Sequence, residues 1–172
     1  MSNFSQKKIY LCGAIGGQHD QNHHHFISQT AQYILDQGGS LLDEHIKAHT
    51  TPEMIEIIYQ KTGVRRDQAP EPWLVTYEQD MDWVDQAEFV IAFVDGPSLG
   101  VGIEIGRTIL KPKIGLNQTS VLLLVHQDNL ESLSLVARGL ASKEDGVDLM
   151  TYQSFADITQ KVDRFLAGGD EG

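Results

Sequence analysis

Glu104 is an acidic residue on a helix face that should be packed. Apolar spacing after Gly100 predicts a helix over 101–111, in which Glu104 shares one side with Val101, Ile105 and Thr108. A carboxylate on such a face is costly unless it is paired or used in chemistry. The sequence leaves two interpretations open: a structural salt bridge to Arg107, three residues further on, or a reactive carboxylate.

Asp80 is the second acidic residue in an unexpected place. Thr76 and Gln79 have the spacing of a capping box and predict a helix from there to about residue 87. Asp80 lies within the predicted inward stripe of this helix, which consists of Tyr77, Met81, Val84 and Ala87. Its carboxylate either caps or bridges to a neighbouring loop, or takes part in a reaction.

The loop at 97–102, with the sequence PSLGVG, joins a predicted strand to the helix of Glu104. Backbone N–H groups converge at a helix N-terminus, the helix dipole favours negative charge there, and glycine permits close approach. The segment is neither a G-x-G-x-x-G motif nor a P-loop. It therefore predicts either an anion site or an ordinary turn in which Ser98 is the N-cap.

Two carboxylates beside an anion-binding turn indicate cleavage of a glycosidic bond in a phosphorylated sugar. In a retaining enzyme one carboxylate attacks the anomeric carbon and forms a glycosyl ester, while the other protonates the leaving group and then activates water. Burial near a second carboxylate raises the pKa of the acid, as this role requires.

These residues must be positioned by alternating strands and helices. Apolar runs predict strands at 8–13, 40–42, 89–94, 121–125 and 147–152. Helical spacing predicts helices at about 26–35, 50–63, 76–87, 101–111, 129–138 and 155–166, with 64–74 as a loop. The pattern predicts an α/β fold, doubly wound, with a mostly parallel five-stranded sheet between helices. Ligands bind such folds beyond the carboxyl ends of the strands.

Composition narrows the class of protein. The 172 residues carry a net charge of −11, with seven acids and no base from Glu78 to Glu104, which argues against nucleic acid and anionic membrane surfaces as partners. The apolar runs fall far short of a membrane span, and the polar start resembles no secretory signal. A single cysteine, Cys12, fits a reducing compartment. We expect one cytoplasmic domain over 1–172, with its core at about 8–166.

Several motifs together resemble the 2′-deoxynucleoside 5′-phosphate N-hydrolases of the nucleoside 2-deoxyribosyltransferase superfamily. The long run PSLGVGIEIGR at 97–107 is the most specific of them. The resemblance spans roughly 8–140 and includes YLCG at 10–13, DEH at 43–45, YEQDMDW at 77–83, DQA at 85–87, Leu133-Ser134 and Ala137-Arg138-Gly139.

The resemblance implies a flavodoxin-like, Rossmann-like three-layer fold and an enzyme without metal or cofactor. It places Glu104 as the nucleophile, Asp80 as the carboxylate that acts on the leaving base, and Tyr10 as a tyrosine lining the sugar and nucleophile. Further implied substrate-binding positions are Gly13, Ile15, Gly16 and Gly17 of the first loop, His45 near the base, and Ser98 and Gly100 at the phosphate. Ser134 is implied to reach the phosphate site of a partner subunit, which makes the protein a homodimer.

The first loop departs from the family. Gly13 is followed by Ala14-Ile15-Gly16-Gly17, where the family reads Ser-Ile-Arg-Gly-Gly, so its serine and arginine are missing. The segment at 46–75 is also long and predicts a surface insertion or a lid.

Some residues of the sequence also suggest functions other than nucleotide hydrolysis. His19 and His23, and likewise His45 and His49, have the spacing of a helical metal pair, but no H-E-x-x-H motif occurs and we expect no metal site. Cys12 lies in an apolar strand, where thiols are normally inert. Transfer of deoxyribose to a second base, and nucleotide binding without catalysis, remain the alternatives to hydrolysis.

Overall fold

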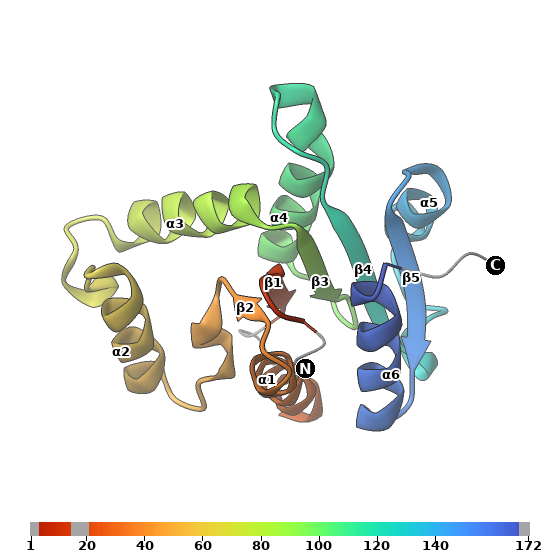
Figure 1. Ribbon diagram of the computed structural model, residues 1–172, viewed down its shortest axis with the longest axis horizontal. Helices are drawn as coiled ribbons and strands as arrows, with labels where there is room; N and C mark the ends of the chain where they lie inside the picture. Colours follow the sequence, from red (N-terminus) through yellow and green to blue (C-terminus); the bar gives the residue numbers. More distant parts are fainter. Residues whose placement is uncertain (1–3, 15–20, 169–172) are drawn as a thin grey trace.

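The computed structural model describes residues 4–14 and 21–168, and they form the expected parallel sheet between helices (Figure 1). The strand order is β2-β1-β3-β4-β5, and all neighbours pair in parallel. The strands are β1 (Lys8–Gly13), β2 (Ser40–Leu41), β3 (Phe89–Phe93), β4 (Ser120–His126) and β5 (Val147–Tyr152). This confirms the predicted fold class.

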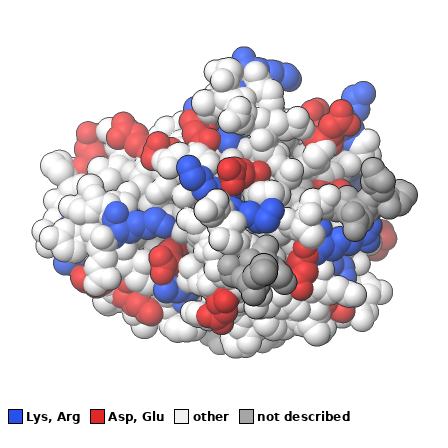
Figure 2. Space-filling view, in the orientation of Figure 1, with Lys and Arg blue, Asp and Glu red and all other residues white. Residues whose placement is uncertain are grey.

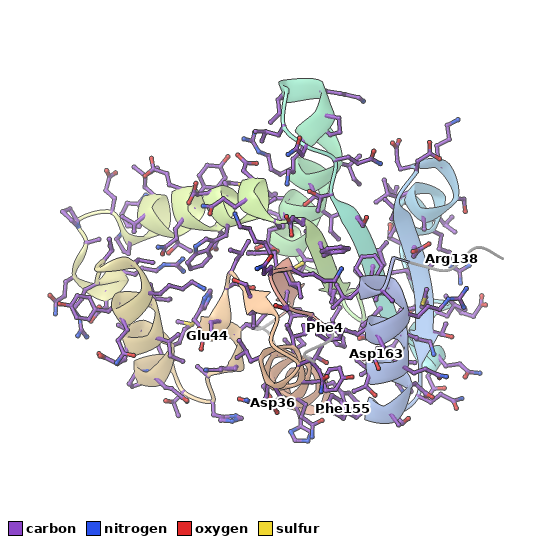
Figure 3. The ribbon with its side chains drawn as sticks, in the orientation of Figure 1. Phe4, Asp36, Glu44, Arg138, Phe155 and Asp163 are labelled. Carbon is purple, nitrogen blue, oxygen red and sulfur yellow. The ribbon has the colours of Figure 1, made fainter. Side chains whose placement is uncertain are left out.

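Helices cover both faces of the sheet. One face packs against α1 (Gln21–Asp36) and α6 (Phe155–Leu166), and the other against α3 (Pro72–Gln86), α4 (Leu99–Leu110) and α5 (Leu135–Lys143). Tyr33 of α1 donates a 2.6 Å hydrogen bond to Asp163 of α6, which connects α1 with α6. Asp163 and Phe155 are labelled on α6 in Figure 3. Short 3-10 helices complete the chain: η1 (Glu44–Lys47), η2 (Arg66–Gln68), η3 (Lys111–Ile114) and η4 (Gln127–Asn129).

Alternate residues of the central strands supply two apolar cores. Ile9, Leu11 and Ile91 face α1 and α6, whereas Tyr10, Cys12 and Val90 face α3 and α4. A strand buried on both faces needs an unbroken apolar run, which is why these strands were recognisable in the sequence. The alternation also decides that Tyr10 and Cys12 lie on the face that carries α4.

The strand order reverses between β1 and β3, since β2 lies on one side of this pair and β4 on the other. In open parallel sheets the crevice at such a reversal, outside the carboxyl ends of the strands, is the usual ligand site. Here it is bounded by the end of β1 at Gly13 and by the loop from β3 into α4.

The segment at 46–75 contains helix α2 (Thr51–Thr62), which extends with the first half of α3 beyond the β2 edge (Figure 1). Its predicted boundaries are confirmed: the Thr50 side chain accepts a hydrogen bond from the Glu53 N–H, and Gly63 ends the helix in the left-handed conformation at φ 72°. Glycine adopts this conformation without steric penalty.

The predicted start of α3 at Thr76 is wrong, because the helix begins at Pro72. Proline is favoured in the first helical turn, where its missing N–H costs nothing. Thr76 is an interior residue whose hydroxyl donates to the carbonyl oxygen of Pro72. Tyr77 is exposed rather than inward, so the predicted stripe is correct only for its later members.

The helix predicted over 129–138 also needs correction. A single turn of 3-10 helix ends at Asn129, and α5 begins six residues later at Leu135, with Ser134 as its N-cap and Gly139 inside it. The serine side chain satisfies a backbone N–H at the helix start, and this capping overrides the weaker signal from glycine.

Within the described parts of the chain, no helix is both long and apolar enough to cross a membrane. On the face seen in Figure 2, acidic and basic side chains are interspersed rather than gathered into a basic stripe.

Candidate active site

A cavity of about 140 Å³ lies at the carboxyl end of β1, where the strand order reverses. It brings together seven residues singled out in the sequence: Tyr10, Gly13, His45, Asp80, Ser98, Gly100 and Glu104. The remaining lining residues are Leu11, Cys12, Asp43, Ile46 and Val101. Four separate parts of the chain therefore meet in one small space: β1, the β2–η1 region, α3 and the start of α4.

Glu104 points into this cavity from the first half of α4. The Tyr10 hydroxyl donates a 2.9 Å hydrogen bond to Oε1 of Glu104. Burial raises the pKa of Glu104 above its ordinary value, the hydrogen bond from Tyr10 opposes that rise, and the charge of Asp80 adds to it. Arg107 does not neutralise Glu104, because its guanidinium forms two hydrogen bonds with Asp85, at 2.7 and 2.9 Å.

Asp80 faces the same cavity from α3 and is 21% exposed. Its Oδ1 accepts a 2.8 Å hydrogen bond from the guanidinium of Arg66, so the bridge to a neighbouring loop that the sequence left open does form. Burial raises the pKa of Asp80, and Arg66 opposes the rise. Asp80 is therefore both paired and available to a ligand.

Tyr10 and Cys12 have similar surroundings, because both face Glu104 from β1. Burial, and then the nearby charges of Asp43 and Glu104, raise the pKa of Tyr10 well above its ordinary value. Burial likewise raises the pKa of the Cys12 thiol, which is hydrogen bonded to Glu104. Both groups stay protonated at neutral pH and act as donors towards the carboxylate, which agrees with the expectation of an unreactive Cys12.

Asp43 is a third carboxyl group in the cavity, and sequence reasoning missed its importance. It is 2% exposed, and its Oδ1 accepts a 3.0 Å hydrogen bond from the Leu11 N–H. Burial raises the pKa of Asp43 well above its ordinary value, although two backbone hydrogen bonds oppose the rise. Its position directly after the short strand β2, at the carboxyl edge of the sheet, was the available signal.

His45 lies in η1 with its ring 5.4 Å from that of Trp83. Burial, and then the positive charges of Arg66 and Lys61, lower the pKa of His45 to about 3, so the imidazole is neutral. Its buried Nδ1 has no hydrogen-bond partner among the residues that the structure describes. A neutral ring with a free polar atom is suited to contact a ligand at this wall.

The loop into α4 has the geometry of a capped helix start. Ser98 is in extended conformation, and its hydroxyl accepts a 3.4 Å hydrogen bond from the Val101 N–H. Gly100 lies in the first turn and lines the cavity, and the first N–H groups of a helix have no acceptor within the helix. A Cβ on Gly13, at the end of β1, would lie 2.4 Å from Cδ1 of Ile27, so a larger residue there would force the Ile27 side chain to move.

Ile15, Gly16 and Gly17 fall outside the described residues, so their predicted roles stay predictions. His19 also falls outside the described residues, and the side chain of His23 is not described, so the expectation for this pair is untested. Among the residues whose side chains are described, no group of three or more His, Cys, Asp or Glu could hold a metal ion.

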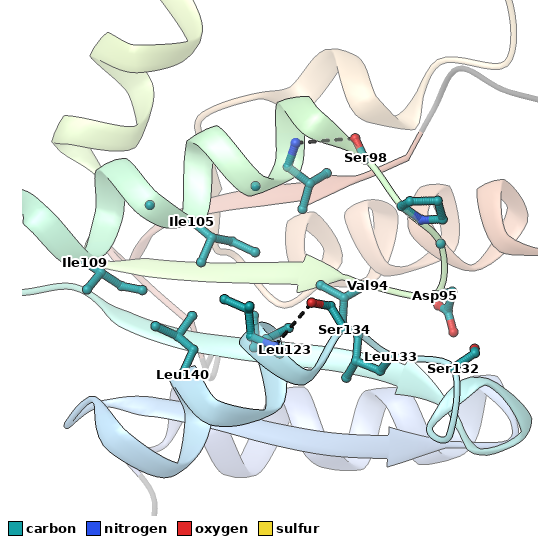
Figure 4. Close-up of a pocket in the computed structure, with 17 residues that line it drawn as sticks. Val94, Asp95, Ser98, Ile105, Ile109, Leu123, Ser132, Leu133, Ser134 and Leu140 are labelled. Atoms are coloured by element: carbon teal, nitrogen blue, oxygen red, sulfur yellow. Dashed lines mark hydrogen bonds between the residues drawn. The ribbon is translucent and has the colours of Figure 1, made fainter.

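Ser134 does not line the small cavity. It caps α5 by accepting a hydrogen bond from the Val136 N–H and borders a larger groove of about 700 Å³ between α4 and α5 (Figure 4). Ile105 and Ile109 point from α4 towards Leu140 of α5 across this groove. Ser98 and Val101 line both spaces, so the groove adjoins the small cavity.

Comparison with known proteins identifies the family to which this chain belongs. The model of the nucleoside 2-deoxyribosyltransferase family matches residues 9–131, which include every described residue of the small cavity. The chain belongs to this family. The sequence resemblance to the same superfamily is thereby confirmed.

Individual relatives match over nearly the whole chain. A human protein named 5-hydroxymethyl-dUMP N-hydrolase is 31% identical over 95% of this chain and 82% of its own length. A protein of Trichoplax adhaerens, named as a putative 2′-deoxynucleoside 5′-phosphate N-hydrolase, is 33% identical over 94% of both chains. The solved structure of CMP N-glycosidase from Clostridium botulinum shares the fold, with a TM-score of 0.57 and 18% identity over 91% of this chain and 98% of the other.

We expect Asp43→Asn to flatten the pH dependence of stability. A carboxyl whose pKa is raised on folding contributes stability that is fully present below its unfolded pKa and is lost as the pH rises through its folded pKa. The asparagine keeps an oxygen for the Leu11 N–H but carries no charge. Relative to the native chain, the variant should gain unfolding free energy as the pH rises from about 4.

Urea denaturation across this pH range measures the effect, with Asp148→Asn, on the exposed side of β5, as the matched control. Parallel stability curves for the native chain and Asp43→Asn would contradict the interpretation.

Proposed function

We propose that this family member hydrolyses the N-glycosidic bond of nucleoside 5′-monophosphates, with 2′-deoxynucleotides as the principal substrates. The observation that carries the proposal is the meeting of Glu104, its donor Tyr10 and the second carboxyl Asp80 in one cavity beside the start of α4. Relatives named as nucleotide N-hydrolases, at 31% and 33% identity, support the same reaction class.

Glu104 supplies the nucleophile. Its carboxylate oxygen attacks C1′ of the sugar, the C1′–N bond breaks, and the electron pair leaves with the base, which takes a proton from Asp80. Tyr10 keeps one oxygen of Glu104 oriented and stabilises its ionised form, so that the other oxygen can attack. The product of this step is a glycosyl ester on Glu104 and a free base.

Water completes the reaction. Asp80, now ionised, takes a proton from a water molecule whose oxygen attacks C1′, and the bond from C1′ to Glu104 breaks. The products are deoxyribose 5-phosphate and the original carboxylate of Glu104. A group that first gives and then takes a proton needs a pKa near the working pH, and burial shifts the pKa of Asp80 in that direction.

The phosphate is assigned to the start of α4. The cavity of about 140 Å³ is smaller than a typical ligand pocket, so a nucleotide must extend beyond it. Ser98 and Gly100 line the cavity at the start of α4, and Ser98 also lines the adjoining groove; a helix start, with its free N–H groups and dipole, attracts an anion. We assign His45, which lines the same cavity from η1, to the base.

A second copy of the chain is proposed to complete the phosphate site. Beside the groove, α4 and α5 expose large apolar side chains: Leu99 is 83%, Leu135 80% and Val136 82% exposed. Gly102 and Gly106 face open space among the described residues, which allows another backbone to approach α4 closely. An apolar surface of this kind next to the site is typical of an interface, and pairing of two copies would bring the partner's Ser134 towards Ser98.

Release of free base tests the proposal. The native chain would be incubated with 2′-deoxynucleoside and ribonucleoside 5′-monophosphates, including 5-hydroxymethyl-dUMP and CMP, and with the matching nucleosides, followed by chromatography. We expect base release from at least one monophosphate and much less from its nucleoside. Addition of a second free base tests deoxyribosyl transfer, the reaction after which the matching family is named and which would yield a new nucleotide. No release and no exchange with any substrate would refute the proposal.

A further inference from the structure

Arg66 is a buried cation immediately behind Asp80. Its side chain is only 10% exposed, and it comes from η2, within the long segment at 46–75. One guanidinium nitrogen donates to Oδ1 of Asp80 at 2.8 Å, and Nε donates to the side-chain oxygen of Gln79, also at 2.8 Å. Arg66 is absent from the cavity lining, so it reaches a substrate only through Asp80.

The guanidinium is held in place from a third side by an aromatic ring. Its central carbon lies 5.5 Å from the centre of the Trp83 ring, which itself contacts His45. A cation–π contact with tryptophan, a hydrogen bond to an amide and an ion pair with a carboxylate together fix the position of an arginine. A surface decoration would need none of these contacts.

We propose that Arg66 is a positioning residue that aims the Asp80 carboxyl into the cavity and keeps it able to ionise, and that the 46–75 segment serves the site by delivering it. This inference rests on the proposed function, in which Asp80 must act first as an acid and then as a base.

The charges around Asp80 explain why such a partner is needed. The titratable and charged groups that face it are Arg66 from η2, Glu104 from α4, Tyr10 from β1 and, one layer further, Asp43 and the neutral His45. Among these, Arg66 is the cation in contact with Asp80. Buried beside a second carboxyl and without this cation, Asp80 would have a still higher pKa, and a smaller fraction of it would be ionised and able to take a proton from water.

Arg66 has a matched control in its neighbour. Arg65 carries the same charge but points outward, where it pairs with Asp67 and Glu56 and contacts the ring of Tyr59. Replacing either arginine with methionine changes the net charge equally, whereas only the replacement of Arg66 removes the ion pair with Asp80.

The test compares Arg66→Met, Arg66→Lys and Arg65→Met with the native chain. Carbon-13 NMR of labelled aspartate would follow the titration of the Asp80 carboxyl, assigned by its absence in Asp80→Asn. We expect the pKa of Asp80 to rise in Arg66→Met, to return towards the native value in Arg66→Lys, and to stay unchanged in Arg65→Met. Thermal unfolding shows whether each variant is folded. If Arg66→Met does not fold, the comparison of Arg66→Lys with Arg65→Met still tests the inference.

Kinetics give a second readout. In Arg66→Met the acid limb of the pH profile of kcat should move to higher pH, and kcat below that limb should fall about tenfold for each pH unit of movement. The first turnover should still release base, because protonated Asp80 remains an acid.

Equal Asp80 titrations in Arg66→Met and Arg65→Met would overturn the inference. That result is distinct from failure of the proposed function, which would appear as absent base release by the native chain, whereas the NMR titration needs no turnover.

Discussion

Glu104→Ala is expected to reduce base release by at least about 10³-fold, the largest effect of any single substitution in this chain. The alanine has no oxygen to bond to C1′, and among the described carboxylates that line the cavity only Glu104 accepts a hydrogen bond from Tyr10. Substrate binding should survive better than turnover, because the start of α4, which is assigned to the phosphate, lies a turn away. The measurement is kcat and KM for base release from the best monophosphate.

Glu104→Gln sharpens this test, since the amide keeps the shape and one acceptor for the Tyr10 hydroxyl. Burial disfavours the charge of Glu104, so neutralising it should leave the melting temperature unchanged or raise it. Loss of activity with retained stability would then report on chemistry rather than folding. If Glu104→Gln kept native turnover, the covalent mechanism would be wrong.

Placing a charge on the α4–α5 face is expected to produce monomers with little activity towards nucleotides. Val136→Asp inserts a carboxylate into the apolar surface that we assign to the second copy. Ile103→Asp does the same on α4, where Ile103 is exposed one turn after Leu99. Desolvating such a charge at an interface costs several kcal/mol, enough to dissociate most dimers. Light scattering gives the mass, and base release gives the activity.

Val64→Asp, on an exposed apolar position after α2, is the control for the added charge. Ser134→Ala separates assembly from phosphate binding, because it leaves the apolar surface intact. In Ser134→Ala, kcat/KM should fall by roughly tenfold or more for monophosphates and far less for nucleosides. A native chain that is monomeric at all concentrations, or Val136→Asp with native mass and activity, would exclude the shared site.

Three carboxyl groups in one small cavity make this a costly arrangement for the folded state. Asp43, Asp80 and Glu104 all have raised pKa values, for which burial is the first cause. Protein sites that keep such groups usually do so because the chemistry requires them, and folding stability is lower as a result. The expected gain of stability in Asp43→Asn at neutral pH is one measure of that cost.

Much of the fold was determined by local sequence. Unbroken apolar runs marked the central strands, and Thr50, Gly63 and Ser98 marked helix ends through their side chains or their conformational freedom. These features depend on neighbouring residues only, so a single sequence records them. The same locality explains the errors at Thr76 and Asn129, where a Pro72 helix start and a Ser134 cap competed with equally plausible signals.

The spacing within helices also determined that Glu104 and Asp80 lie on faces turned away from solvent. It could not determine what those carboxylates meet. Arg107 is three residues from Glu104 yet pairs with Asp85, 22 positions away, while Arg66 reaches Asp80 from a segment that has no helical period of its own.

Only the tertiary structure decided which groups share the cavity. The strand order places β1 beside β3, and this brings Tyr10 into contact with Glu104, which is 94 positions away in the sequence. The same arrangement places Asp43 near Tyr10. Ion pairs and pKa values depend on distances between distant segments and on the exclusion of water. Those quantities exist only once the chain has folded, which is why the sequence alone did not reveal the contacts of Arg66 and Asp43.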